Sequence, residues 1–236
     1  FPLYPVAAKD TFDVIVLADP QPLVQEDLNY LRDDIVTELT DISASFGIVL
    51  GDIVWDNLAL YDHYNTIMSV IDKPLYHTPG NHDFNHNPEN NHYSLDTYNR
   101  CFGPAYYAFE YGQVSFIIIN SVGWNEDVQD KTRNSYEGRV DEKQLQWIGN
   151  YLQHVPDHRL IVLCMHIPLY SYTDQGIKFN VTNRKAVYEV LKERKYLLAV
   201  NGHLHKTENM YLDNNAGWNY DHPFHLITCT TASGAL

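Results

Sequence analysis

Apolar residues follow two periods along the first third of the chain. Residues 12–18 and 48–50 form β-branched apolar runs typical of buried strands, and residues 74–77 form a third strand-like run that ends at a Pro-Gly pair. Between the first two runs, apolar residues recur at three- and four-residue steps, which predicts an amphipathic helix: Leu28, Leu31, Ile35 and Leu39. A second helix is expected over about residues 59–71. Alternating strands and helices predict a parallel sheet with helices packed outside it.

The rest of the chain continues the alternation with longer loops. Residues 106–110 and 114–120 predict a β-hairpin. Buried strands are expected at 160–165 and 196–200, and further strands near 209–212 and 224–229. Helices are expected after Asp141 and over residues 183–194. Residues 85–98 predict a polar loop leading into a short helix, and residues 121–138 predict a loop.

Five of the predicted strands end at polar side chains suited to chemistry. These side chains are Asp19 and Gln21, Asp52, the Asn81-His82-Asp83 triplet, His166, and the pair His203 and His205. Ligands of open α/β sheets bind outside the carboxyl ends of the strands. We therefore expect all five sets to converge on one rim.

Composition narrows the class of protein. The 236 residues are 44% hydrophobic, which suits one large domain or two small ones, and no apolar run approaches the roughly 18 residues of a membrane helix. We therefore expect no membrane insertion. The net charge of −14 argues against nucleic-acid binding. Three widely spaced cysteines give no disulfide framework and no metal knuckle, and we expect Cys164 to be a buried small hydrophobe.

The clustered residue types predict a centre with two metal ions. Carboxylate and amide oxygens with imidazole nitrogens, and no thiolate, suit hard-to-borderline divalent cations. Two ions roughly 3.5–4 Å apart need a spanning ligand, for which we select Asp52. One site is completed by Asp19, Gln21 and His205, and the other by Asn81, His166 and His203. Two carboxylates against two divalent ions leave a net positive site that suits an anionic substrate.

The motif order Asp-x-Gln, Gly-Asp, Gly-Asn-His-Asp, His and Gly-His-x-His resembles the calcineurin-like metallophosphoesterase superfamily, in a branch whose first motif is Asp-x-Gln rather than Asp-x-His. The resemblance spans Asp19 to His205. Residues 102–107 and 144–148 also resemble this family, the former its purple-acid-phosphatase-type members. The resemblance implies an α/β fold, a four-layer αββα sandwich of two mixed β-sheets flanked by helices. It also implies a domain at 11–236 after a leading segment or linker at 1–10.

The resemblance further implies the reaction. A metal-bridged hydroxide in a dinuclear centre would hydrolyse a small phosphoric mono- or diester. His82 would protonate the leaving oxygen, and Asp83 would hydrogen-bond to His82 and fix its tautomer. The two ions would be Mn, Fe, Zn or Mg, with Mn favoured because the neutral amide of Gln21 is a harder and weaker donor than imidazole. The abrupt ends of the chain resemble the trimmed central domain of secreted or periplasmic bacterial members with flanking β-rich domains.

Several alternatives stay open from the sequence alone. The fold could serve as a non-catalytic protein-interaction module or as a nuclease, although the acidic charge disfavours the latter. Gln21 could lie behind the ligands, and His166 could be an ordinary strand-end histidine. Other residues near the motifs have weaker expectations: Asp56 and Asn57 as loop braces, His77 as a packing residue, His63 as a surface residue, His86 and His92 as substrate contacts, Tyr170 and Trp124 as pocket walls, and Arg100 and Arg139 as phosphate ligands.

Overall fold

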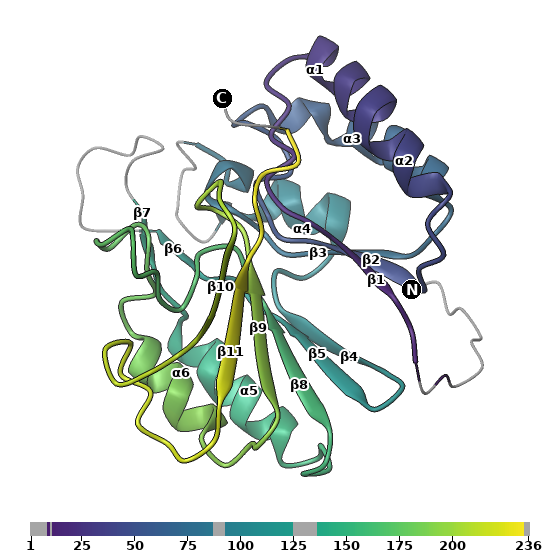
Figure 1. The fold of residues 1–236 in the computed structure, drawn as a ribbon. Coiled ribbons are helices and arrows are strands. Elements are labelled where there is room, and N and C mark those ends of the chain that lie inside the picture. Colours follow the sequence, from purple (N-terminus) through teal and green to yellow (C-terminus); the bar gives the residue numbers. More distant parts are fainter. Residues whose placement is uncertain (1–8, 10, 87–92, 125–135, 234–236) are drawn as a thin grey trace.

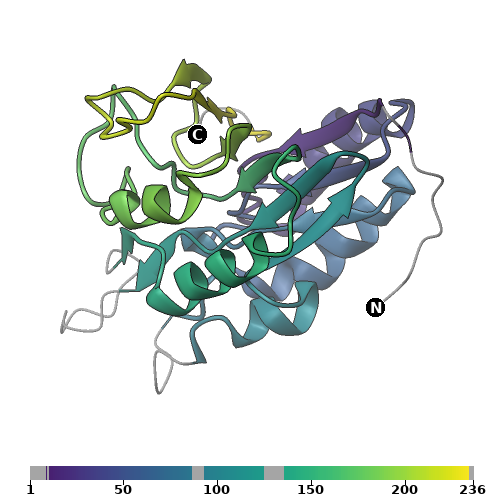
Figure 2. The same ribbon diagram turned by 90° about the horizontal axis from the view of Figure 1, so that it is seen from below.

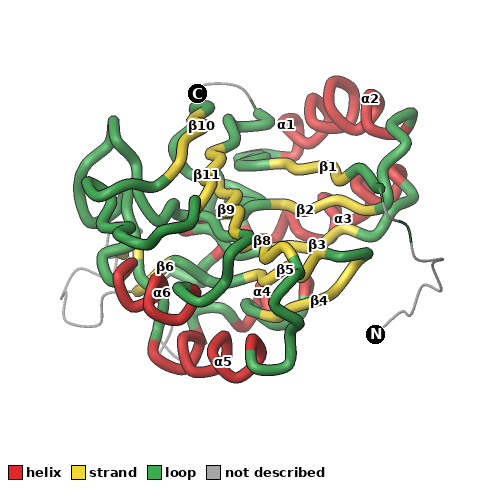
Figure 3. Tube along the Cα trace, turned by 60° about the horizontal axis from the view of Figure 1, so that its bottom comes forward, coloured by secondary structure: helices red, strands yellow, loops and turns green. Residues whose placement is uncertain are grey.

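The computed structural model describes residues 9, 11–86, 93–124 and 136–233. Two sheets stack face to face, and helices cover the outer side of each (Figure 1, Figure 3). The smaller sheet has the order β1-β2-β3, with β1 Val14–Leu17, β2 Phe46–Val49 and β3 Leu75–His77. Its three described strands are all parallel, which departs from the mixed sheet predicted there.

The larger sheet is mixed, as predicted. Its order is β10-β11-β9-β8-β5-β4, in which β11, β9, β8 and β5 are parallel and the two edge strands are antiparallel to their neighbours. The strands are β4 Tyr107–Tyr111, β5 Val114–Ile118, β8 Leu160–Cys164, β9 Leu197–Asn201, β10 Glu208–Tyr211 and β11 Phe224–Thr228.

Helices form the two outer layers, one group against each sheet. Against the smaller sheet lie α1 Gln25–Tyr30, the π-helical Leu31–Val36, α2 Thr37–Thr40, the 3-10 turn Leu58–Leu60, α3 Tyr61–Met68, the 3-10 turn Ser69–Ile71, and α4 Asp96–Phe102. Against the larger sheet lie α5 Glu142–Leu152 and α6 Arg184–Leu191. Figure 2 shows the same layers from below.

Alternating side chains of each strand fill separate cores on its two faces. In β1, Ile15 and Leu17 pack against the helices of the smaller sheet, whereas Val14 and Val16 face the larger sheet. In β8, Ile161 and Leu163 face α5 and α6, whereas Val162 and the buried thiol of Cys164 face the smaller sheet. Three apolar layers therefore separate four layers of secondary structure, which confirms the predicted sandwich.

Two local predictions need correction. The helix predicted over Leu28 to Leu39 is interrupted by the π-helical Leu31–Val36, so its regular spacing of apolar residues does not reflect one uniform α-helix. The loop predicted at 121–138 contains two short antiparallel strands, β6 Val122–Trp124 and β7 Tyr136–Gly138. Strands of three residues are too short for an alternating pattern to reveal. Among the described residues, no helix is long and apolar enough to span a membrane.

Candidate metal centre

The strand topology brings the predicted residues to one rim. Strands β1, β2 and β3 are parallel and share one carboxyl edge, and so do β8 and β9 of the facing sheet. Direct contacts join the two edges. The backbone N–H of His203, after β9, donates to Asp19 Oδ2 after β1 at 2.9 Å. The ring of His166, after β8, lies 2.7 Å from the carbonyl oxygen of Leu50 after β2.

One group of ligand atoms is formed by Asp52, His166 and His203, whose candidate donor atoms all lie within 4.8 Å of one another. His166 Nε2 lies 3.2 Å from Asp52 Oδ2, 3.1 Å from Asn81 Oδ1 and 3.1 Å from His203 Nδ1. The other ring nitrogens donate to backbone carbonyls: His166 Nδ1 to Leu50, and His203 Nε2 to Lys178 at 2.9 Å. These backbone bonds leave His166 Nε2 and His203 Nδ1 as the ring nitrogens that face the Asp52 cluster and could ligate an ion.

A second group is formed by Asp19, Gln21 and His205. Asp19 Oδ1 lies 3.5 Å from His205 Nε2, and the Gln21 amide donates to Asp52 Oδ2 at 2.8 Å. Asp52 Oδ2 thus touches both groups, while its Oδ1 accepts the backbone N–H of His82 at 2.8 Å. Asp52 occupies the position at which the two groups meet.

The donor set fits divalent cations. Asp19 Oδ1 and Gln21 Oε1 are buried and have no hydrogen-bond partner among the described residues. Buried polar oxygens without partners are rare because they cost about 1–3 kcal/mol each. A cation beside Asp52 and His205 would satisfy both oxygens. Oxygen and imidazole donors without thiolate suit hard-to-borderline metals, so the residues fit the predicted ions.

The electrostatics also show a preference for positive charge. Burial acts to lower the pKa of His166, but the neighbouring carboxylates, Asp52 above all, raise it to about 9. Burial and the charge of His166 lower the pKa of His203 to about 3. Burial acts to raise the pKa of Asp52, and the surrounding imidazoles outweigh it and leave that pKa below its usual range. A carboxylate ionised in so dry a place needs cations next to it.

Backbone strain is concentrated at this rim. Seven described residues other than glycine have a positive φ, and all but Asp72 belong to the rim: Asp19, Gln21, Asp52, Asp56, His203 and His205, with φ between 43° and 73°. Such conformations cost about 1–3 kcal/mol each and persist where the surroundings hold them. The strain lies at the predicted ligands and at Asp56.

His82 lies beside the two groups, and its partner differs from the predicted one. Its Nδ1 is 2.7 Å from Asp56 Oδ1, and its Nε2 is 3.9 Å from Asp52 Oδ2. Burial acts to lower the pKa of His82, but the hydrogen bond to Asp56 and the nearby carboxylates raise it. The indole of Trp55 stacks on the imidazole, with ring centroids 4.3 Å apart and planes inclined by 23°. The prediction that Asp83 holds His82 is therefore wrong.

Asp83 instead anchors the turn from beneath. Its buried carboxylate accepts the backbone N–H groups of Gly80 at 2.8 Å and Ile53 at 3.1 Å, and the hydroxyl of Tyr61 at 2.8 Å. Burial and the charge of Asp52 raise its pKa to about 7. The carboxylate joins the loop after β2 to the turn after β3, and these hydrogen bonds hold it away from the His82 ring. The position of Asp83 directly after His82 suggested that it binds the imidazole, whereas the carboxylate that does so belongs to Asp56.

The weaker expectations have mixed outcomes. His77 is buried against Phe102, with ring centroids 4.5 Å apart, which confirms its packing role. Arg139 pairs with Glu137 at 3.7 Å, and the Tyr170 ring lies under the Arg184 guanidinium. Trp124 stacks on Phe84, and His86 contacts Asp56. His92 lies outside the described residues. The only sequence signal that could have pointed to Asp56 as the partner of His82 was its position four residues after Asp52.

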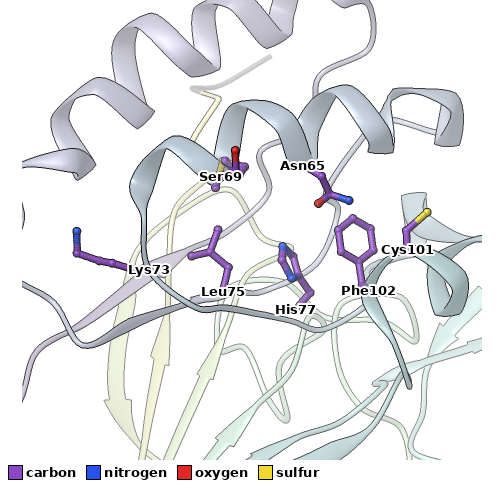
Figure 4. A pocket seen from close by; sticks show the side chains of 8 residues that line it. Asn65, Ser69, Lys73, Leu75, His77, Cys101 and Phe102 are labelled. Atoms are coloured by element: carbon purple, nitrogen blue, oxygen red, sulfur yellow. The ribbon is translucent and has the colours of Figure 1, made fainter. Parts of the chain in front are cut away.

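A pocket of about 310 Å³ lies elsewhere, beside β3 and between α3 and α4 (Figure 4). The side chains of Asn65, Leu75, His77 and Phe102 point into it, together with Cys101. None of its lining residues belongs to the two ligand groups. The chemistry of the strand-end rim does not extend to this pocket.

A four-layer α/β sandwich with carboxylates, an amide and imidazoles at facing strand ends is the arrangement of a metallophosphoesterase. The sequence model of the calcineurin-like phosphoesterase family matches residues 12–207, and the chain belongs to that family. No curated protein sequence gives a significant match.

Solved structures support the fold assignment. A dimetal phosphatase from Danio rerio is 18% identical, with 94% of this chain and 88% of that chain covered and a TM-score of 0.67. The phosphopantetheinyl hydrolase PptH from Mycobacterium tuberculosis is 12% identical, with 92% and 89% covered and a TM-score of 0.52. GAP50, the anchor in the inner membrane complex of Plasmodium, is 15% identical, with 94% and 74% covered and a TM-score of 0.56. At these identities the likeness shows the shared fold.

Proposed function

We propose that this chain hydrolyses phosphoric mono- or diesters with two divalent metal ions, manganese favoured, held at the strand-end rim. The observation that carries the proposal is the pair of buried oxygens Asp19 Oδ1 and Gln21 Oε1, which have no hydrogen-bond partner among the described residues, beside the cluster of Asp52, His166 and His203. Buried oxygens without hydrogen bonds are costly, and a cation held by both would offset that cost.

Each ligand has a place in this proposal. Asp52 would be the ligand shared by the two ions, since its Oδ2 touches both groups. Asp19, Gln21 and His205 would hold one ion, and Asn81, His166 and His203 would hold the other. When bound, the ions offset charge on the phosphoryl oxygens and acidify a water nucleophile. With two divalent ions the site would be net positive and would attract a small anionic phosphoester, although the chain as a whole has a net charge of −14.

His82 is the proposed proton donor to the leaving oxygen. Because its Nδ1 is bonded to Asp56, its Nε2 is the nitrogen that faces Asp52 and hence the reacting centre. Trp55 packs on the ring face and limits rotation of the imidazole. A positioned general acid contributes about 10²–10⁴-fold to the rate.

The direct test compares two aryl esters, 4-nitrophenyl phosphate and bis(4-nitrophenyl) phosphate, with and without added Mn²⁺. We expect metal-dependent hydrolysis of at least one ester by the wild type and its loss in Asp52→Asn, which should also lose metal from both sites. Loss of metal from only one site would deny Asp52 the bridge. The preferred ester decides between monoesterase and diesterase.

The alternative is a non-catalytic interaction module on the same fold. A structural neighbour described as an anchor motivates it. Against the module, His82 lies 3.9 Å from Asp52, and the cluster of Asp52, His166 and His203 supports a site able to hold metal. Hydrolysis of neither ester with any of Mn²⁺, Mg²⁺, Zn²⁺ or Fe²⁺ would favour the module.

A further inference from the structure

A single carboxylate oxygen links two histidines next to the metal centre. Asp56 Oδ1 lies 2.7 Å from His82 Nδ1 and 2.8 Å from His86 Nε2. An ionised carboxylate only accepts hydrogen bonds, so both ring nitrogens donate N–H groups to it. The two bonds place a proton on His82 Nδ1 and on His86 Nε2 and make a chain His86–Asp56–His82. The proton that His82 would donate to the leaving oxygen is a second one, carried on its Nε2.

The shared oxygen restrains the carboxylate. Asp56 has a φ of 59°, a left-handed conformation that persists where the surrounding structure holds it. Both imidazoles use Oδ1, so rotating the carboxylate to present Oδ2 to His82 would break the bond to His86. Burial acts to raise the pKa of Asp56, but the two imidazole bonds outweigh it and hold that pKa well below its usual range.

His86 is itself held in place. Its ring lies 6.2 Å from that of Trp124, which stacks on Phe84 at 5.5 Å. The adjacent Asn85 donates its backbone N–H to the carbonyl of Ser94 at 2.7 Å, and its side chain accepts from Thr97 at 2.7 Å. The imidazole therefore reaches Asp56 from a segment with its own support.

We propose that His86 is a positioning residue for the reaction: through Asp56, it fixes the orientation of the His82 imidazole that protonates the leaving group. This inference rests on the proposed function for the role of His82. His86 contacts neither a predicted metal ligand nor the substrate in this scheme. Its effect therefore depends on the leaving group and vanishes when His82 is absent.

The experiment measures kcat/KM on two phosphoesters that differ in their leaving groups, 4-nitrophenyl and the poorer phenyl ester. His86→Leu removes the donor, whereas His86→Gln keeps an N–H at the reach of Nε2. His158→Ala, at an exposed position, is the matched control. Two further variants, His82→Ala alone and His82→Ala combined with His86→Leu, complete a double-mutant cycle with His86→Leu and the wild type.

The expected pattern is specific to positioning. His86→Leu should lose about tenfold on the phenyl ester and less than about threefold on the 4-nitrophenyl ester, as for an outer partner of a functional imidazole. His86→Gln should recover most of the loss, and His158→Ala should match the wild type. In the His82→Ala background, His86→Leu should have no further effect. Equal losses on both esters, or a loss that persists without His82, would overturn the proposal.

A second measurement does not depend on activity. In the zinc-loaded protein, the Nδ1–H proton of His82 should give a hydrogen-bonded NMR resonance in the wild type and in His86→Gln. It should shift and broaden in His86→Leu. An unchanged resonance in His86→Leu contradicts the inference. A wild type that hydrolyses no phosphoester contradicts the proposed function instead, and the resonance still decides the link between the two histidines.

Discussion

At the scale of single residues, the rim combines buried charge with left-handed backbone. Six of its residues have a positive φ, and two of its buried side-chain oxygens have no hydrogen-bond partner among the described residues. Both features cost free energy in the folded chain. Because both are concentrated at the predicted ligands, we attribute them to metal binding. Single substitutions here should therefore change metal binding before they change the fold.

Gln21 would distinguish the two proposed metal sites. A neutral amide oxygen is a weaker zinc donor than imidazole, so the site of Asp19, Gln21 and His205 should bind zinc more loosely than the other. After dialysis against dilute chelator, we expect the wild type to keep close to one zinc ion per chain. Gln21→His should bind zinc about tenfold more tightly at the site of Asp19 and His205. Equal occupancy of both sites in the wild type would contradict this assignment.

Asp83 tests the corrected role of the turn. Its carboxylate accepts three donors, and an amide in its place would turn an N–H₂ group towards some of them. We expect Asp83→Asn to lower the free energy of unfolding in urea by about 2–3 kcal/mol. Asp62→Asn, on the exposed side of α3, should change it by less than about 0.5 kcal/mol. Unchanged stability of Asp83→Asn would show that the carboxylate is no anchor.

At the scale of elements, close approach between strand ends depends on glycine. A Cβ on Gly202 would lie 2.4 Å from Asp19 Oδ2, and one on Gly80 would lie 2.2 Å from Asp52 Oδ1. These approaches let the end of β9 meet the end of β1, and the end of β3 meet the end of β2. Gly202 is therefore needed where the two sheets meet, and Gly80 where two neighbouring strands of the smaller sheet end.

Gly202→Ala should displace the Asp19 carboxylate because that side chain is buried and has little room to move. We expect metal affinity at the Asp19 site to fall by at least about tenfold, as measured by metal content after dialysis. Gly149→Ala in α5 is the control, since its Cβ would meet only Val190 at 3.9 Å. That variant should keep its metal and gain about 0.5–1 kcal/mol of stability. Full metal content in Gly202→Ala would refute the steric account.

His77 at the end of β3 gives the fold a pH dependence. Burial lowers its pKa from 6.5 to about 3, so the folded chain holds it neutral while the unfolded chain takes up a proton below pH 6.5. The contribution of neutral His77 to the free energy of unfolding is complete above pH 6.5. It declines by about 1.4 kcal/mol per pH unit as the pH falls towards 3. Urea unfolding should show His77→Gln losing less stability than the wild type between pH 7 and pH 5. Parallel losses would exclude this residue as a cause.

The elements also show how far the sequence reaches. Apolar runs located β1, β2, β3, β8 and β9 to within a few residues, because buried parallel strands need continuous apolar sequence. The polar residues after them identified the rim. The pattern missed β6 and β7, which are too short to show a period. It also missed the bond between Asp56 and His82, because a left-handed φ at residue 56 leaves no signature in side-chain order.

At the scale of the whole molecule, two sheets supply one centre. The smaller sheet contributes Asp19, Asp52 and Asn81, and the larger contributes the histidines, so the rim exists only when both sheets pack face to face. Metal binding should therefore stabilise the sandwich as a unit, by about 2.7 kcal/mol at a hundredfold excess over Kd.

The most direct test of the two-metal account is a titration of the metal-free protein with Mn²⁺, with bound metal and 4-nitrophenolate release measured in the same samples. The account predicts two ions per chain and a rate of hydrolysis that rises only as the second ion binds. Full activity with one ion per chain, or no hydrolysis with two bound, would contradict it.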